Sequence, residues 1–286
     1  MNITPQERMK LKGEGCISQN DGEHFAIRFP VVAGNLTSEQ ARVAADVADR
    51  YGRHYYSLTV RMALEIPYIA YEDIAAVRTR MAEVGLYSGG TGKRVRPVVA
   101  CKGTVCVHGL CDTQGLASAL HEQFYPREMP GKTKIGISGC PNNCAKAQLN
   151  DIGIIGAMHP AFELANCIGC GACAKVCPTA ALTCDGGKLL FDPAKCIDCG
   201  KCVRTCRKEA VFPLYRGVRL YVGGRFGRAW HVGEPLEPVF AVEEVPSAIE
   251  TLLSWYKEHA NPGERIEAVL AREGIAAANA LFSAAK

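Results

Sequence analysis

The chain has 286 residues, and 48% of them are hydrophobic, which is enough for a buried core in one or two domains. The net charge of +4 comes from 33 basic and 29 acidic residues, a balance that argues against nucleic acid as a partner. No segment approaches the length of a membrane span, and residues 1–15 lack the apolar segment of a signal peptide. We therefore expect a cytoplasmic protein with no membrane partner.

The first half of the chain predicts helices that cover a sheet. Residues 23–33 have the pattern of a strand. Thr37 and Gln40 then form a capping-box pattern, which predicts a helix that begins there and ends near Arg50. Further strands are expected at 55–60, 63–69, 95–100 and 134–138, and further helices at 72–84 and 113–123.

The second half contains a segment of different composition, which begins near residue 161 and ends near residue 209. After it, residues 211–240 predict short strands and turns. The tail predicts helices at about 246–259 and 262–282, the second with Asn261 as its cap and Pro262 at its first helical position. The order of elements predicts an α+β fold. Its main domain is formed by residues 1–160 and 210–286, and residues 161–209 are an inserted domain.

Fifteen cysteines are the outlying feature of the composition. In a secreted protein they would suggest disulfides, but the count is odd, no export signal is present and many cysteines lie only three residues apart. Thiolate binding of metal in a reducing compartment explains these spacings better. Cys16 and Cys184 fit no motif, and we expect them to be structural.

Two runs of four cysteines repeat one spacing, Cys-x2-Cys-x2-Cys-x3-Cys, between residues 167 and 206. The spacing is typical of bacterial-type ferredoxins with two [4Fe–4S] clusters, in which the fourth cysteine of each run binds the cluster of the other run. Zinc is the alternative, but it would use only half of the eight cysteines. The spacing predicts one cluster on Cys167, Cys170, Cys173 and Cys206, and a second on Cys177, Cys196, Cys199 and Cys202.

Four more cysteines directly follow two of the predicted strands: Cys101 and Cys106 follow the strand at 95–100, and Cys140 and Cys144 follow the strand at 134–138. Loops at the ends of neighbouring strands can converge on one ligand. Spacing alone leaves open whether these cysteines bind zinc or whether the first pair belongs to the core.

The residues around these cysteines resemble the signature segments of the siroheme-dependent sulfite and nitrite reductases. The two segments are CKGTVCVHGLCDTQGLA (101–117) and KTKIGISGCPNNCAKAQLNDIGIIG (132–156). Arg28-Phe29-Pro30, the Leu58–Arg61 segment and the Val222–Arg228 segment fit other parts of the same domain. The resemblance covers most of residues 20–260. Within the family it is strongest to the siroheme subunit of anaerobic sulfite reductases and to the small sulfite-reductase-like proteins with a fused ferredoxin.

The resemblance implies a siroheme-reductase domain, a sheet covered by helices, that binds a [4Fe–4S] cluster through Cys101, Cys106, Cys140 and Cys144. It also implies that Cys144 bridges this cluster to the iron of siroheme, so that the expected cofactors are siroheme and three [4Fe–4S] clusters. Cys111, five residues after Cys106, is a competing ligand. The chain departs from the family in having four residues between the first two cysteines, where longer members usually have five. It also has residues 62–67 (MALEIP) where a polar continuation is usual.

Siroheme carboxylates and small oxyanions both require positive charge. The resemblance places Arg28, Arg61, Lys132 and Lys134 against the substrate. The residues better placed to hold siroheme carboxylates are Lys93, Arg94, Arg96, Arg225 and Arg228. The alternative for each is a solvated surface charge. For Arg28 and Arg61, which interrupt strand patterns, a functional role is favoured.

Together these features predict an enzyme that reduces sulfite to sulfide with six electrons, supplied through residues 167–206. Reduction of nitrite to ammonia and a non-catalytic iron–sulphur electron carrier are the alternatives. The large members of the family contain two copies of this domain and this chain has one, so we expect a homo-oligomer or a multi-subunit reductase. An electron-donor protein is a further expected partner, and the basic residues near the cysteine runs favour an acidic one.

Overall fold

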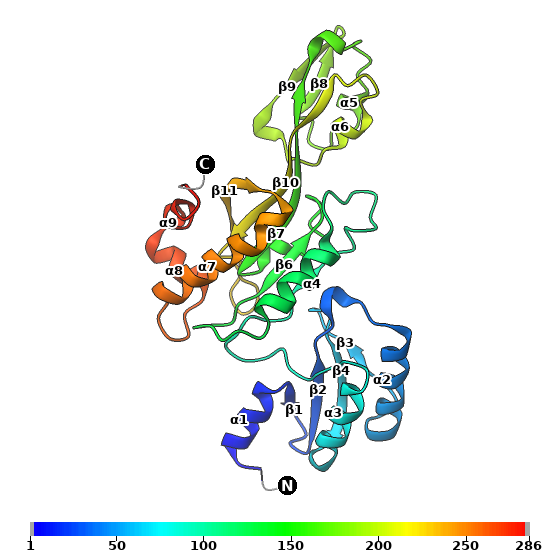
Figure 1. Ribbon diagram of the computed structural model, residues 1–286, viewed down its shortest axis with the longest axis vertical. Coiled ribbons are helices and arrows are strands. Elements are labelled where there is room, and N and C mark those ends of the chain that lie inside the picture. Colours follow the sequence, from blue (N-terminus) through cyan, green and yellow to red (C-terminus); the bar gives the residue numbers. More distant parts are fainter. Residues whose placement is uncertain (1–2, 284–286) are drawn as a thin grey trace.

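The computed structural model describes residues 3–283 and has three parts, which Figure 1 shows one above the other. The N-terminal part holds a four-stranded sheet and the central part holds a five-stranded sheet. A small lobe projects from the central sheet on the side away from the N-terminal part. Within residues 3–283, no helix is both long enough and apolar enough to cross a bilayer.

The N-terminal part is an antiparallel sheet with helices packed on it. Its strands, in the order β1-β2-β4-β3, are β1 (Cys16–Ser18), β2 (His24–Phe29), β3 (Ser57–Leu58) and β4 (Leu64–Ala70). Its helices are α1 (Pro5–Gly13), α2 (Ser38–Tyr51) and α3 (Ile74–Ala82). The capping box at the start of α2 is confirmed, since Gln40 N donates to Thr37 Oγ1 and Thr37 N donates to Gln40 Oε1. Buried side chains of α2, α3 and the sheet form one apolar core.

The central part is a mixed sheet in the order β11-β10-β7-β6-β5. The strands are β5 (Val99–Ala100), β6 (Ile135–Ser138), β7 (Ile152–Phe162), β10 (Val211–Val222) and β11 (Glu234–Phe240). β5, β6 and β7 are parallel, whereas β10 is antiparallel to both of its neighbours. The helices α4 (Thr113–Phe124), α7 (Val245–His259), α8 (Ile266–Glu273) and α9 (Ile275–Ala280) share one large apolar core with these strands.

The lobe lies between β7 and β10 in the sequence, and it stands at the far end of these two paired strands (Figure 1). It contains α5 (Ala172–Lys175), the hairpin β8 (Leu182–Asp185) and β9 (Lys188–Phe191), and α6 (Lys201–Thr205). The chain leaves the central sheet at Phe162 and re-enters it at Val211, which pairs with Phe162. The predicted boundaries of an inserted domain, 161 and 209, lie next to these positions.

Several predicted strands have different bounds. The strand expected at 23–33 ends at Phe29, because Pro30 has no N–H to continue the ladder. The strand expected at 95–100 is reduced to Val99–Ala100. Residues 211–240 form two strands, β10 and β11, instead of several short ones. The prediction of short strands was wrong because Pro213 and Gly217, which are typical turn residues, lie within β10.

The predicted helix at 262–282 is also wrong in its start and its continuity. Arg265 is the N-cap of α8, and Asn261 and Pro262 lie in the preceding turn, where Asn261 N donates to Glu264 Oε2. Gly274, at φ +81°, separates α8 from α9. A left-handed conformation is compatible with glycine and ends a helix. Helix α1 and strand β1 were not predicted.

Candidate functional site

Cys101, Cys106, Cys140 and Cys144 lie together where β5 and β6 end. Burial raises the pKa of the Cys140 thiol, and the neighbouring Cys101, Cys144 and Cys106 raise it further. The backbone N–H of Gly139 donates to Cys101 Sγ over 3.1 Å, as a hydrogen bond to a thiolate would require. The loops are held close by glycines: a Cβ on Gly109 would lie 1.8 Å from the carbonyl oxygen of Gly103. The two predicted pairs therefore converge.

Cys111 is a fifth cysteine near this group, since Cys101 and Cys140 both influence its titration. Its side chain is 8% exposed and belongs to the apolar core of the central sheet. Burial raises the pKa of its thiol to about 11, and it also raises that of Cys202 in the lobe to about 12, so protonation does not separate Cys111 from the predicted ligands. Cys106 and Cys144 are exposed. Cys111 thus lies in the core beside the four cysteines and stays a competing ligand.

The eight cysteines of the lobe fall into two groups. A cavity of about 610 Å³ is lined by the first predicted set, Cys167, Cys170, Cys173 and Cys206. A second, much smaller cavity is lined by Cys177, Cys196, Cys199 and Cys202. The short helices α5 and α6 begin at Gly171 and Gly200, which both have a left-handed conformation and repeat the same turn. The structure thus brings together the two sets that the spacing predicts, with the fourth cysteine of each run crossing to the other group.

Cys184 also lines the larger cavity of the lobe, and its thiol faces the carbonyl oxygen of Gly169 over 3.7 Å. Cys16 is fully buried in the core of the N-terminal part, where burial raises the pKa of its thiol to about 11. Cys16 is thus placed as a core residue, whereas Cys184 lies beside a group of possible ligands.

Basic side chains gather at the opposite ends of the same parallel strands. We call Arg61, Arg96, Lys132, Lys134 and Arg265 the basic cluster. Arg61 donates to Asn150 Oδ1 over 2.9 Å and to the carbonyl oxygen of Pro97 over 2.8 Å. Burial, together with the nearby Arg96 and Arg265, lowers the pKa of Arg61 to about 10. Such a pKa still leaves the guanidinium charged at neutral pH.

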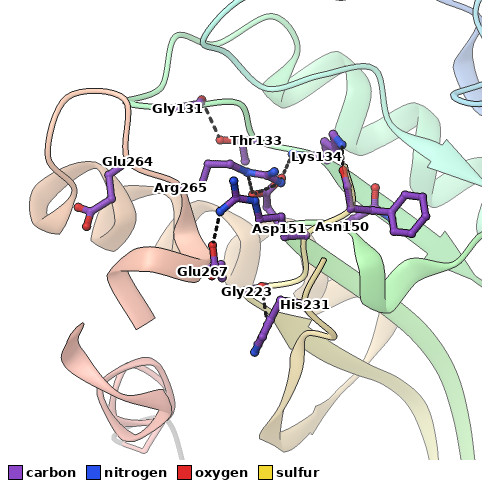
Figure 2. A network of polar contacts seen from close by, with 12 residues as sticks. Gly131, Thr133, Lys134, Asn150, Asp151, Gly223, His231, Glu264, Arg265 and Glu267 are labelled. Carbon is purple, nitrogen blue, oxygen red and sulfur yellow. Dashed lines mark hydrogen bonds and ion pairs between the residues drawn. The ribbon is translucent and has the colours of Figure 1, made fainter. Parts of the chain in front are cut away.

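Asp151 is the carboxylate at the centre of the basic cluster, and its side chain is fully buried. Figure 2 shows Arg265 facing it, with Nε 2.9 Å from Asp151 Oδ1 and Nη2 2.8 Å from Oδ2. The backbone N–H of Lys134 donates to the same carboxylate over 2.9 Å. Burial raises the pKa of Asp151, and Arg265 opposes this effect. Asp151 and Arg265 are separated by 114 residues, and no motif in the sequence pairs them.

The two predicted lysines lie inside this field of positive charge. Burial lowers the pKa of Lys134, and the nearby Arg61 and Arg265 lower it further. Burial also lowers the pKa of Lys132, with Arg96 and Arg265 as the next causes. An ammonium group with a lowered pKa releases its proton more readily near neutral pH. The cluster can therefore bind an anion and supply protons to it.

Arg28 lies beside the basic cluster. Burial is the largest cause of the lowered pKa of Arg96, and the charge of Arg28 is the next. Its own charge is partly compensated by Glu65, which accepts from Arg28 Nε over 2.8 Å and from Nη2 over 2.6 Å. Arg61, Arg94 and Arg96 each have a buried Nε with no hydrogen-bond partner among residues 3–283. Unsatisfied guanidinium donors at one place fit a ligand that carries carboxylates or other oxyanions.

The other residues predicted to hold carboxylates differ in their surroundings. Lys93 and Arg228 are exposed, and Arg228 lies near Lys132. Arg225 is paired with Glu267 over 3.0 Å, so its charge is already compensated. Lys12, on α1, also lies close to Lys132. Lys12 was not predicted because α1 was not recognised.

The cysteines and the basic cluster occupy opposite ends of the parallel strands. Lys134 directly precedes β6 and Cys140 follows it by two residues, while Arg96 precedes β5 and Cys101 follows it. The four residues of β6 alone span about 13 Å. The charged or ionisable groups that shift the pKa of Cys140 are other thiols, whereas those that shift the pKa of Lys134 include Arg61, Arg265 and Asp151. The two halves of the candidate site are therefore separated along the sheet.

Two protein-family profiles match this chain. The nitrite and sulphite reductase 4Fe-4S domain matches residues 91–283, and the nitrite/sulfite reductase ferredoxin-like half domain matches residues 17–84. Residues 91–283, which match the 4Fe-4S domain, contain the paired cysteine loops. The chain belongs to the nitrite and sulphite reductase family.

Relatives with assigned names include sulfite reductases. The chain is 35% identical over 263 residues to the coenzyme F420-dependent sulfite reductase of Methanocaldococcus jannaschii, covering 91% of this chain and 42% of that protein. It is 36% identical over 190 residues to a subunit of the anaerobic sulfite reductase of Salmonella typhimurium, covering 61% of this chain and 53% of that protein. An uncharacterised protein of M. jannaschii is 34% identical over 232 residues and is covered to 82%. The chain therefore spans only about half the length of the two named sulfite reductase relatives.

Solved structures share the fold at low sequence identity. Dissimilatory sulfite reductase I superposes with a TM-score of 0.73 at 21% identity, covering 90% of this chain and 68% of that chain. The NirA protein of Mycobacterium tuberculosis superposes with a TM-score of 0.67 at 15% identity, covering 96% of this chain and 45% of that chain. The mixed helix-and-sheet fold is therefore that of sulfite and nitrite reductase structures.

Proposed function

We propose that this chain reduces sulfite to sulfide with six electrons, at a siroheme coupled to a [4Fe–4S] cluster. The observation that carries the proposal is the pair of half-sites on β5 and β6, four convergent thiols at one end and the basic cluster at the other. Membership of the nitrite and sulphite reductase family and the names of the sulfite reductase relatives support it.

The residues fit the two groups that the reaction needs. Cys101, Cys106, Cys140 and Cys144 would hold the cluster, with Cys144 as the thiolate shared with siroheme. The unsatisfied Nε atoms of Arg94 and Arg96 fit the carboxylates of the macrocycle. When bound, siroheme would provide the iron at which the anion is held and reduced.

The chain's own contribution at the substrate is positive charge and protons. Arg28 and Arg61 would orient the anion through its oxygens, since a guanidinium offers two donors in one plane. Lys132 and Lys134, whose pKa values are lowered by burial, would donate protons as the oxygens leave as water. Asp151 would hold Arg265 and the backbone of Lys134 in place without touching the anion.

We further propose that the complete site forms between two chains. Siroheme held by Cys144 would present the anion at the cysteine end of β6, but the basic cluster of the same chain lies at the other end of this strand. A second copy, or another subunit with the same fold, would bring its basic cluster to the cysteine end of the first. The Salmonella relative is by its name a subunit of a larger enzyme, which supports an assembly.

Electrons would reach this site through the lobe, which we propose to be a ferredoxin-type domain with two [4Fe–4S] clusters, for a total of three. The two groups of four cysteines support this assignment. An electron-donor protein would dock on the lobe.

The first test is anaerobic purification of the whole protein followed by its absorption spectrum, its iron content and its turnover with reduced methyl viologen. Siroheme bands and faster turnover of sulfite than of nitrite are expected. Much faster turnover of nitrite would make nitrite the substrate, and cluster absorption without siroheme bands would make the chain an electron carrier.

The second test uses subunit complementation. Cys144→Ser should be inactive and Lys134→Ala should keep only about 1% of the activity, because each damages one half-site. If the two half-sites come from different copies, mixing the two variants under conditions of subunit exchange should restore about a quarter of the activity, since half of the dimers are mixed and each has one intact site. No restored activity in dimers shown to exchange, or full activity of a monomer in light scattering, would contradict the proposal.

A further inference from the structure

One side chain of the lobe makes two hydrogen bonds to the loop that carries Cys106. Arg204, on α6, donates from Nη1 to the carbonyl oxygen of Val107 over 2.7 Å and from Nη2 to that of Gly109 over 2.6 Å. Within residues 3–283, these are the only hydrogen bonds between the lobe and residues 101–111. The forked guanidinium thus fixes two carbonyls of one loop at once.

Arg204 occupies a special place in the lobe. It lies between Cys202, which belongs to one group of four thiols, and Cys206, which belongs to the other. It also lines the larger cavity, where Cys206 gathers with the first three cysteines of the first run. Both cysteine groups of the lobe are therefore connected through α6 to the residue that contacts the Cys106 loop.

The loop itself has little else to hold it toward the lobe. Val105 and Val107 are each 82% exposed, and Cys106 is exposed as well. From the central sheet, Arg216 Nε donates to the carbonyl oxygen of Leu110 over 3.1 Å, and Leu110 N donates to the carbonyl oxygen of Gly139 over 2.8 Å. These contacts fix the end of the loop at the sheet, whereas Arg204 fixes its middle to the lobe.

The second attachment of the lobe is at its base and does not involve this loop. Asp198, which is 6% exposed, accepts from Tyr215 over 3.0 Å and from Arg219 Nε over 2.8 Å, and it contacts His159 over 2.5 Å. His159, Tyr215 and Arg219 lie on β7 and β10, the strands that carry the lobe. This network fixes the base of the lobe on β7 and β10, and Arg204 provides a second fixed point at the Cys106 loop.

We propose that Arg204 is a positioning residue that docks the lobe on the Cys106 loop and so sets the distance over which electrons cross to the Cys101/Cys106/Cys140/Cys144 site. This inference rests on the proposed function, because it takes both sites to hold clusters. In each crossing one reduced cluster of the lobe loses one electron and the receiving cluster gains it, and no bond or proton changes. Arg204 takes no part in the redox chemistry itself.

The experiment compares holoproteins with Arg204→Ala, Arg204→Lys and, as a matched control, Lys175→Ala, which removes one exposed charge from the same lobe. Each oxidised protein is mixed in a stopped-flow instrument with less than one equivalent of reduced methyl viologen. The measured quantity is the slow redistribution phase, in which the siroheme bands change after the first reduction of the clusters. Iron and sulfide content are determined on the same samples.

Arg204→Ala should keep its iron and slow the redistribution roughly 10- to 100-fold, because small misplacements of reacting groups have effects of this size. The redistribution rate of Arg204→Lys should lie between those of the wild type and Arg204→Ala, since one ammonium cannot hold both carbonyls in a planar fork. Lys175→Ala should redistribute electrons at the normal rate. The spin–spin coupling between reduced clusters of the lobe and of the Cys101/Cys106/Cys140/Cys144 site, measured by electron paramagnetic resonance, should weaken most in Arg204→Ala. It should be unchanged in Lys175→Ala.

A normal redistribution rate in iron-replete Arg204→Ala would overturn this inference and leave the proposed function intact. If Arg204→Ala loses iron, the test rests on Arg204→Lys. A normal redistribution rate in Arg204→Lys with full iron content would then overturn the inference. A wild-type protein that holds no clusters after anaerobic reconstitution would overturn the proposed function, and the inference with it.

Discussion

The lobe and the central sheet differ in what holds them together. The central sheet and its helices share a large apolar core that extends from β5 to α9. The buried core of the lobe consists of Cys173, Leu182, Cys202 and Val211, so half of it is cysteine. Apolar burial of this size cannot offset the entropy of ordering some fifty residues. With the clusters proposed above, the lobe should depend on metal binding for its folding, whereas the central sheet should not.

Removal of iron should produce the largest difference in stability between the lobe and the central sheet. Anaerobic chelation of the clusters should unfold the lobe, because structural metal binding contributes on the order of 10 kcal/mol in small metal-dependent domains. Hydrogen exchange measured by mass spectrometry should then show residues 163–210 unprotected and β6 and α7 still protected. Equal loss of protection in both regions would show that the sheet also depends on iron.

The buried ion pair of the central sheet should have the next largest effect. Asp151→Asn leaves the charge of Arg265 without its carboxylate, and Arg265 is only 15% exposed, so we expect a loss of about 3–5 kcal/mol in unfolding free energy. Glu250→Gln, which breaks the half-exposed pair with Arg127, is the control and should cost less than about 1 kcal/mol. Iron content of the lobe should be normal in both. Similar costs for the two variants would contradict the central role of Asp151.

Lys134→Ala separates electron supply from chemistry. Sulfite turnover should fall roughly 100-fold, as expected when a charged donor to a reacting anion is removed, which corresponds to about 2.7 kcal/mol. Reduction of the clusters by viologen should proceed at the normal rate, because the lobe is unchanged. Lys257→Ala, which removes an exposed charge from α7, is the control. A variant at Lys134 with normal turnover would remove this residue from the substrate site.

The smallest expected effect concerns the cap of α4. Asp112 accepts from the N–H groups of Gln114 and Gly115 and from the hydroxyl of Thr104, and this hydroxyl is the largest cause of the lowered pKa of Asp112. Asp112→Ala should cost about 1 kcal/mol at neutral pH. Because the folded-state pKa is lowered, the contribution is present above the usual value of 3.8 and is lost as the pH falls through the folded-state pKa. The difference between variant and wild type, measured by urea unfolding, should therefore shrink in acid.

Local patterns accounted for most of what the sequence predicts correctly. The two groups of lobe cysteines could be assigned because three ligands of each lie within seven residues, and the capping box of α2 lies within four residues. The convergence of Arg61 and Lys134 came from the family resemblance and not from spacing. Asp151 and Arg265 were missed, because a pair 114 residues apart leaves no trace in one sequence.

The errors in the fold have a similar origin. Pro262 after Asn261 is a good start for a helix by local rules, but the side chain of Glu264 accepts hydrogen bonds from the backbone N–H of Asn261 and from the guanidinium of Arg272, and the helix begins later. Pro213 and Gly217 indicate turns in isolation, yet β10 pairs with β7 through both positions, with a register shift after Pro213. At β10 the non-local pairing with β7 decided the structure, whereas at Asn261 the side chain of Glu264 did so.

The pairing of Phe162 with Val211 closes the insertion point of the lobe, so the lobe can be replaced as a unit. Its two ends leave and re-enter the sheet on adjacent antiparallel strands, the place where an ordinary hairpin needs only a short turn. A different unit could be inserted at the same point without a change in the register of β7 and β10. The lobe can thus be exchanged while the central sheet is kept.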